Sequence, residues 1–197
     1  MDEQTIQAYT SNAETFATRY ESVSGGVSTF FPQVFRAGMR VLDIGCGSGR
    51  DVARLTELGC DAWGMEPSSR LLEEAVRHHP NLRERLLAGG LPDELGVLAG
   101  RRFDGIVLSA VLMHIPDEQL FNSAVAIREL LTDGGRLLVS VPVSRPALDP
   151  EGRREADGRL FRIRGEQALH ALFGQVGFLA HDTWKSSDAL CRDGIQW

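Results

Sequence analysis

A glycine-rich stretch, VLDIGCGSGRD at residues 41–51, constrains the fold of this chain more than any other feature. An apolar run carries Asp43 near its end and leads into Gly45, Gly47 and Gly49, and a segment suited to a helix follows. Glycine lets the backbone adopt positive φ and approach a ligand closely, so a strand, a glycine-rich turn and a helix in this order are typical of an anion or nucleotide seat. The stretch therefore predicts a nucleotide-binding α/β fold.

Two details of this stretch narrow the class of nucleotide. The dinucleotide fingerprint G-x-G-x-x-G needs a third glycine where this chain has Arg50, so the fingerprint fails. The carboxylate of Asp43, two residues before the first glycine, would repel a pyrophosphate at the same turn and would suit a positively charged group. The turn therefore favours a nucleoside with a cationic tail over one with phosphates.

The rest of the chain alternates short β-type runs with helical segments, which predicts a doubly wound, mostly parallel sheet. The expected strands are Met39–Ile44, Asp61–Glu66, Arg83–Ala88, Phe103–Ser109, Arg136–Val141 and Phe178–Lys185. Before them, apolar residues recur at helical spacing from Ile6 to Tyr20 and predict one amphipathic helix, which Gly25-Gly26 would end. We therefore expect one structural domain in which an N-terminal helical lid, residues 1–38, precedes a nucleotide-binding part, residues 39–197.

Four motifs, in order along the chain, resemble those of class I S-adenosylmethionine-dependent methyltransferases. Residues 43–49, DIGCGSG, match the family's D/E-x-G-x-G-x-G motif, and WGMEPS at 63–68 matches the end of its second strand. FDGIVLS at 103–109 with MHI at 113–115 resembles its fourth strand and the motif after it, and LLTDGGRL at 130–137 resembles the approach to its fifth strand. The resemblance implies a methyltransferase fold, S-adenosylmethionine as cofactor and methyl transfer by direct displacement.

Carried over position by position, the resemblance implies a set of cofactor contacts. Asp43 would lie beside the methionine moiety, Glu66 would accept both ribose hydroxyls, and Ser109 would lie near the methionine carboxylate or the sulfonium. Tyr9 and Tyr20 on the lid would contact the cofactor, and the alternative for both is ordinary helix packing. The full set is Tyr9, Tyr20, Asp43, Gly45, Cys46, Gly47, Gly49, Glu66, Pro67, Gly90, Leu91 and Ser109.

The sequence departs from the family pattern at two places. After the third strand the family often has an acidic residue that reads the adenine amino group, whereas this chain has Ala88-Gly89-Gly90, so backbone groups would have to take that part. The family's sheet usually ends with an antiparallel seventh strand, and this sequence stops at Trp197, where that strand would begin. Either the natural polypeptide continues, or the edge of the sheet needs another partner.

Overall composition excludes several classes of protein. The formal net charge of −6 argues against nucleic acid as a partner, and no apolar run is long enough to cross a membrane. The three cysteines are odd in number and lack metal-ligand spacing, so we expect free thiols and no metal site. With no signal sequence visible, we expect a cytoplasmic protein that acts on a small molecule; nothing in the sequence indicates an oligomeric state.

Candidates for chemistry on the acceptor are few. The motif places His114 near the strand ends, where it is a candidate general base, and a structural hydrogen bond is the alternative. Arg153, Arg154 and Arg159 belong to a basic cluster that would bind an anionic group of the substrate or form a solvated loop. Two other functions remain open. One is a non-catalytic S-adenosylmethionine-binding module. The other is a nicotinamide-dependent oxidoreductase, and Asp43 and Arg50 disfavour this second function.

Overall fold

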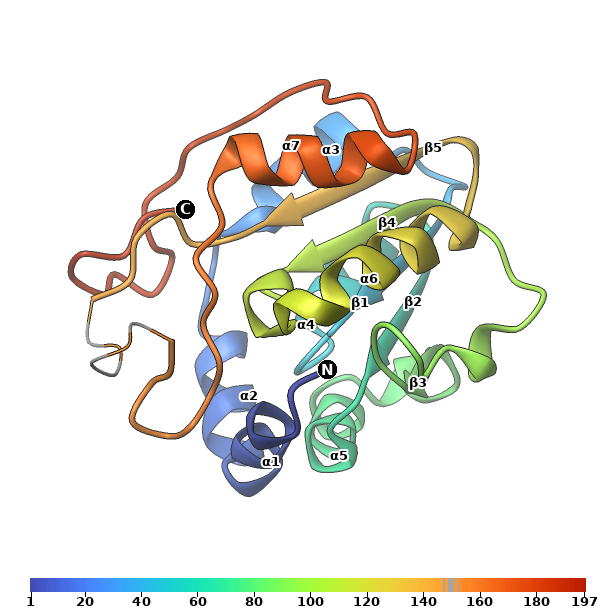
Figure 1. Ribbon diagram of the computed structural model, residues 1–197. Helices are drawn as coiled ribbons and strands as arrows, with labels where there is room; N and C mark the ends of the chain where they lie inside the picture. Colours follow the sequence, from blue (N-terminus) through green and yellow to red (C-terminus); the bar gives the residue numbers. More distant parts are fainter. Residues whose placement is uncertain (147, 149–150, 152) are drawn as a thin grey trace.

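In the computed structural model, which describes residues 1–197 apart from 147, 149–150 and 152, five parallel strands form one sheet. Their order is β3-β2-β1-β4-β5 (Figure 1). The central strands are covered on both faces, so β1 is buried along its whole length after Arg40. The bounds are β1 Arg40–Ile44, β2 Asp61–Glu66, β3 Leu86–Ala88, β4 Phe103–Ser109 and β5 Leu131–Ser140. The doubly wound parallel sheet predicted from the sequence is confirmed.

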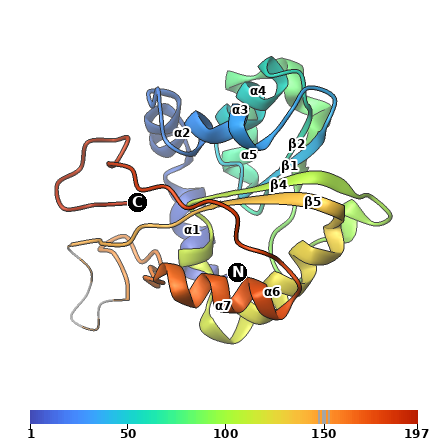
Figure 2. The ribbon, with the colours of Figure 1, turned by 90° about the horizontal axis from the view of Figure 1, so that it is seen from above.

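Helices cover both faces of the sheet (Figure 2). One face carries α3 (Phe31–Val34), α4 (Arg50–Glu57) and α5 (Ser69–His78), and the other carries α6 (Asp117–Leu130) and α7 (Glu166–Gln175). Short 3-10 turns complete the connections: η1 Val27–Phe30, η2 Pro80–Arg85, η3 Gly96–Leu98 and η4 Leu112–His114. The chain order reverses between β1 and β4, so the loops after these strands diverge and leave a crevice at their carboxyl ends.

The N-terminal segment forms two helices where the sequence predicts one. α1 (Glu3–Ser11) and α2 (Ala13–Glu21) are separated at Asn12, whose backbone leaves the helical region with φ −123° and ψ 26°. The Asn12 side-chain amide donates to the carbonyl of Ala8 at 3.0 Å, and such local bonds compete with helix continuation. The expected single helix is therefore wrong at this residue.

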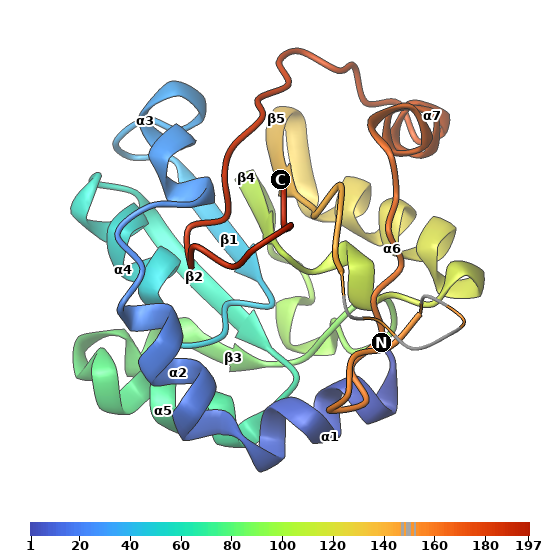
Figure 3. The same ribbon diagram turned by 90° about the vertical axis from the view of Figure 1, so that its left-hand side faces the viewer.

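The two halves of residues 1–38 pack in different places. α1 and α2 lie together against α5 (Figure 3), where Phe16 and Ala17 pack on Leu71. In contrast, Phe31 and Phe35 are 2% and 1% exposed and belong to the core beneath the sheet. The lid boundary at residue 38 stays a prediction, because Val27, Phe31 and Phe35 are buried in the core, whereas Phe30 and Val34 of the same segment line the cavity in the crevice.

Three of the expected strands differ from the structure by more than one residue. Residues Pro80–Arg85 form η2, and only Leu86–Ala88 pair with β2, so the strand expected from Arg83 is half as long. The strand expected at Phe178–Lys185 is absent, because this segment wraps around the outer edge of β5 instead of pairing with it. Phe178 packs on Phe173 at one face, and Trp184 stacks on Phe30 at the other, with ring centroids 4.7 Å apart. β5 itself begins earlier than expected, at Leu131.

A salt bridge ties α1 to the loop that follows β5, and it yields a pH-dependent prediction. Asp2 caps α1 by accepting from the Thr5 backbone N–H at 2.9 Å, and Arg154 donates to Asp2 at 2.9 and 3.0 Å. Hydrogen bonding from Arg154 lowers the pKa of Asp2 from 3.8 to about 2. Asn caps helices as well as Asp does, so Asp2→Asn removes mainly the ion pair and is expected to cost about 1 kcal/mol at pH 7.

The sign of the pH effect follows from the lowered pKa. The carboxylate stabilises the fold above its unfolded-state pKa, and the contribution is lost as pH falls towards 2. Urea unfolding of Asp2→Asn and the parent chain should therefore show a difference that shrinks with acidification. A difference that stays constant from pH 7 to pH 3 would contradict this role of the ion pair.

Candidate active site

The turn after β1 lies at the carboxyl end of the sheet and has a backbone that favours glycine. Gly45, Gly47 and Gly49 have φ of 73°, 56° and 82°. A Cβ on Gly45 would lie 2.7 Å from a methyl carbon of Val111, and the ring of Tyr20 packs 3.5 Å from the Cβ position of Gly47. The Gly45 N–H donates to the Met65 carbonyl at 2.7 Å, which fixes the turn against β2. A ligand can therefore approach the backbone here.

Glu66, the last residue of β2, faces this turn. One carboxylate oxygen accepts from the Gly47 N–H at 3.1 Å, and the other accepts from the Ser68 N–H at 3.0 Å. Burial raises the pKa of Glu66 to about 7, against the two backbone N–H groups, which lower it. Each oxygen keeps a further lone pair, so the side chain can still accept two hydroxyl groups from a ligand.

Asp43 is a buried acid that lacks a partner in the described part of the chain. It is 1% exposed, and its Oδ1 atom has no hydrogen bond there. Burial, together with the nearby carboxylate of Asp51, raises the pKa of Asp43 well above its usual value. A cationic group placed beside it would stabilise its charged form and satisfy the orphaned oxygen.

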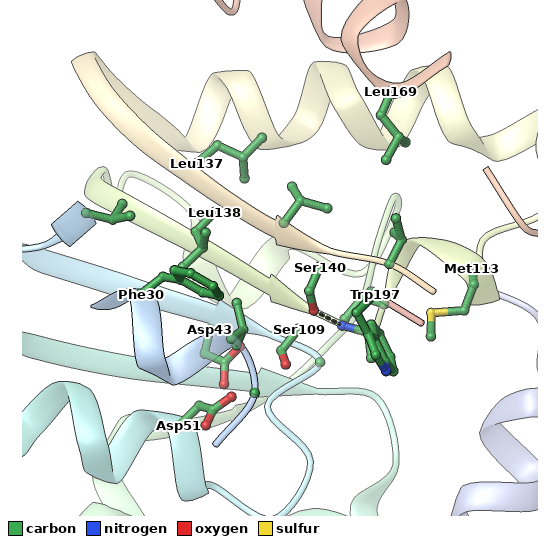
Figure 4. Close-up of a pocket in the computed structure, with 18 of the residues that line it drawn as sticks. Phe30, Asp43, Asp51, Ser109, Met113, Leu137, Leu138, Ser140, Leu169 and Trp197 are labelled. Atoms are coloured by element: carbon green, nitrogen blue, oxygen red, sulfur yellow. Dashed lines mark hydrogen bonds between the residues drawn. The ribbon is translucent and has the colours of Figure 1, made fainter. Parts of the chain in front are cut away.

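These groups open into a cavity of about 810 Å³ that runs from the glycine turn along β4 and β5 (Figure 4). The figure shows Asp43 and Asp51 at one end, Ser109 and Ser140 in the middle, and Met113 with Trp197 further along. Among the residues predicted from the sequence, the cavity is lined by Tyr9, Tyr20, Asp43, Gly45, Cys46, Gly47, Glu66, Pro67, Ser109, His114 and Arg159. The structure thus brings most of the predicted cofactor contacts together.

Three predicted cofactor residues lie outside the lining of this cavity. Gly49 caps α4, and a Cβ there would approach Ala75 and the His79 ring at 3.4 and 3.3 Å. Gly90 pairs with Glu94, and Leu91 is 1% exposed in the core, where its carbonyl accepts from the Met1 ammonium group at 2.9 Å. A contact between Gly90 or Leu91 and adenine stays a prediction.

The two lid tyrosines both reach the cavity, but they do so differently. Tyr20 packs its ring on the turn at Gly47, and burial raises the pKa of its hydroxyl well above the usual value. The hydroxyl of Tyr9 lies 3.0 Å from Nε2 of His114. Both tyrosines therefore line the cavity and pack within the N-terminal helices, because the Tyr20 ring stacks on Phe16 and the Tyr9 ring packs against Phe16 in a tilted arrangement.

His114 has an environment that makes it a poor base. It is 4% exposed, and its Nδ1 lies 2.6 Å from the carbonyl oxygen of Leu160. Burial is the main cause that lowers the pKa of His114 to about 4, and the charges of Arg159 and Arg145 lower it further. The ring is therefore neutral at pH 7, and its bonds fit the structural alternative better than general-base catalysis.

The three arginines predicted for the substrate separate in space. Arg159 lies inside the cavity, where it pairs with Glu155 and with Asp157 at 2.8 Å. Arg154 pairs with Asp2 on the lid, and the Arg153 side chain is 53% exposed and pairs with Glu151 at 4.0 Å. Of the three, only Arg159 is placed to contact a molecule in the cavity.

Several lining residues were missed by the sequence reasoning. Arg145 lies over the ring of Phe161 at 4.0 Å and pairs with Glu155. Trp197 lines the same cavity, and its indole N–H donates to Asp188 at 2.9 Å. These residues come from loops without a motif, so only their position in the basic or C-terminal part of the chain could have drawn attention to them. Ala110, with the rare φ of 59°, follows β4 and also lines the cavity.

The described residues lack two features that would bear on function. They contain no group of three or more His, Cys, Asp or Glu side chains arranged to hold a metal ion. No helix among them has the length and apolar character needed to span a membrane.

Comparison with known proteins identifies the family. A sequence model described as a methyltransferase domain matches residues 16–182. The ubiquinone biosynthesis O-methyltransferase of Azorhizobium caulinodans is 33% identical over 104 residues, which cover 52% of this chain and 40% of that protein. The chain thus matches less than half the length of this relative.

Solved structures agree in fold. The 1,6-didemethyltoxoflavin-N1-methyltransferase of Burkholderia thailandensis has a TM-score of 0.76 at 22% identity and covers 97% of this chain and 83% of its own. A TehB-like methyltransferase from Corynebacterium glutamicum has a TM-score of 0.64 at 20% identity and covers 85% of this chain and 83% of its own. The chain belongs to the methyltransferase domain family, and the class I S-adenosylmethionine-dependent assignment predicted from its motifs is confirmed.

Proposed function

We propose that this protein binds S-adenosylmethionine and transfers its methyl group to a small-molecule acceptor. The observation that carries the proposal is the buried oxygen of Asp43 that lacks a hydrogen bond, beside a glycine turn that lines the cavity. The cofactor is a nucleoside with a positively charged amino-acid tail, which suits this donor set. A pyrophosphate would meet the carboxyl groups of Asp43, Asp51 and Glu66 at the same place.

Each residue around the turn would hold a different part of the cofactor. Glu66 would accept the ribose hydroxyls, Asp43 would face the ammonium group directly or through water, and Tyr20 would cover the turn at Gly47. When bound, the cofactor supplies an activated methyl group on a sulfonium. The protein then has to align the acceptor with that methyl and exclude water, which lid helices α1 and α2 can do.

The cationic residues that line the cavity support a methyl acceptor that is a small molecule with an anionic group. Arg159 and Arg145 are buried cations within reach of the cavity, while the nearest imidazole, His114, is held neutral. The relatives support the small-molecule part of this proposal, because their names refer to ubiquinone biosynthesis and to 1,6-didemethyltoxoflavin. Cys46, Cys60 and Cys191 are free thiols, which supports the cytoplasm as the compartment.

Arg159→Gln is expected to raise the KM for the acceptor about tenfold and leave the cofactor KM unchanged. The reason is that Arg159 is a buried cation that lines the cavity, whereas the proposed cofactor contacts are assigned to Asp43 and Glu66. Arg153→Gln, in the same loop but exposed, is the matched control and should leave both constants alone. Equal effects of the two substitutions would contradict an anion site at Arg159.

Transfer of labelled methyl from S-adenosylmethionine into a cell metabolite extract tests the proposed activity. Label should appear in small molecules and depend on the protein. Saturable cofactor binding without any label transfer would favour the non-catalytic binding module, which the sequence leaves open.

A further inference from the structure

The side chains of Arg159, Tyr9 and His114 form a chain of hydrogen bonds in the cavity, and the direction of these bonds can be assigned. A carbonyl oxygen only accepts, so the short contact to Leu160 places the proton of His114 on Nδ1. His114 is neutral, and its Nε2 must therefore accept. The hydroxyl of Tyr9, 3.0 Å away, has to be the donor.

Tyr9 consequently has no proton left for a ligand. Its oxygen also receives a weaker bond from Nη1 of Arg159 at 3.3 Å. Towards the cavity the tyrosine oxygen can act only as an acceptor, and a ligand that meets it must bring an N–H or O–H group. A ligand carrying only acceptor atoms would leave two lone-pair-bearing oxygens facing each other.

Arg159 offers the complementary group beside it. Its hydrogen bonds to Tyr9, Glu155 and Asp157 engage three of the five N–H groups that a guanidinium carries. The guanidinium lies 5.3 Å from the Tyr9 ring centroid and 5.5 Å from that of Phe161, and the side chain lines the cavity. An acceptor oxygen adjacent to the ligand's donor would therefore meet a buried cation.

The walls of the cavity around Tyr9 and Arg159 consist largely of aromatic rings and apolar side chains. Phe161 stands edge-on to His114, with centroids 4.8 Å apart, and both residues line the cavity with Met113 and Trp197. Aromatic and thioether surfaces of this kind pack well against a planar ring.

We propose that Tyr9 and Arg159 select the methyl acceptor as a planar ring compound that carries an N–H or O–H donor next to an oxygen acceptor. Cyclic amides and ring hydroxy-carbonyl compounds are the chemical class. His114 is a positioning residue that sets the direction of the Tyr9 hydroxyl. This inference rests on the proposed function for its catalytic meaning, but the recognition can be measured without turnover.

The test compares two probes of the same shape, 2-quinolone and coumarin, which differ only in that a ring N–H becomes a ring oxygen. Their affinities are measured by calorimetry with the protein saturated with S-adenosylhomocysteine. The parent chain should bind 2-quinolone about tenfold more tightly than coumarin, because coumarin leaves the Tyr9 oxygen unpaired. Tyr9→Phe should bring that ratio close to one.

Two further variants separate positioning from folding. His114→Asn can still donate to the Leu160 carbonyl but gives Tyr9 no Nε2 acceptor, so Tyr9 regains a proton to donate and the ratio should fall. Ser186→Ala removes a hydroxyl from the lining of the same cavity and should leave the ratio as in the parent chain. A merely structural role for His114 would lower thermal stability without moving the ratio.

Each remaining outcome counts against the inference. A parent ratio near one, a ratio that survives Tyr9→Phe, or no saturable binding of either probe up to its solubility limit would overturn it. If S-adenosylhomocysteine binds in the same experiments, the proposed function stands despite that failure. If it does not bind, the proposed function fails by itself, and the probe ratio is then read on the protein alone.

Discussion

Gly45→Ala is expected to destabilise the protein by about 2–4 kcal/mol, whereas Gly134→Ala should cost about 1 kcal/mol. Both glycines have φ of 73°, so the backbone penalty for alanine is the same. The surroundings differ, because the new Cβ at Gly45 would lie 2.7 Å from Val111, while nothing lies within 4 Å at Gly134. Val111 is buried and β-branched, so it cannot easily turn away.

Urea unfolding of the two variants measures this difference directly. Gly45→Ala should also weaken cofactor binding, since relief of the contact has to move either Val111 or the turn itself. Equal losses of stability in the two variants would mean that the close packing of the turn against Val111 contributes nothing.

Glu66→Gln is expected to weaken S-adenosylhomocysteine binding by about 2 kcal/mol, roughly thirtyfold. The substitution removes the charge, and the new amide group must face one of the two backbone N–H donors, from Gly47 or Ser68, that the carboxylate now accepts. Glu73→Gln, on the exposed surface of α5, is the matched control and should bind as the parent chain does.

The same residue predicts a pH dependence. Because the pKa of Glu66 is raised to about 7, the carboxyl group of the ligand-free protein takes up a proton as pH falls below that value. Protonation removes an acceptor site, so cofactor affinity should decline from pH 8 to pH 6 in the parent chain. In Glu66→Gln the decline should be absent, and a parallel decline in both proteins would rule out Glu66 as its source.

The glycine turn and its acids could be predicted because they are local. Asp43, Gly45 and Glu66 sit at the ends of strands whose apolar runs are visible in the sequence, and the carboxyl ends of parallel strands meet at one edge of the sheet. Neither the turn nor β2 depends on distant loops for its register. The sequence therefore sufficed for the order of the parallel strands and for the glycine turn with its acids.

The part of the cavity that we propose binds the methyl acceptor could not be predicted in the same way. Arg145, Phe161 and Trp197 come from long connections without periodicity, and only the tertiary fold brings them to Tyr9. The lowered pKa of His114 depends on burial and on two arginines far away in the sequence. The segment at 178–185 likewise has strand-like composition but forms no strand. A strand there would have to pair with the edge of β5, and composition alone does not show whether that pairing takes place.

Calorimetric titration with S-adenosylhomocysteine, with NAD as the comparison ligand, tests the central claim most directly. The claim is that a buried acid with one unsatisfied oxygen, beside a glycine turn that lines the cavity, selects a cationic nucleoside over a diphosphate. We expect saturable binding of the adenosyl ligand at one site per chain and none of NAD. Saturable binding of NAD, or no heat with the adenosyl ligand, would contradict the account.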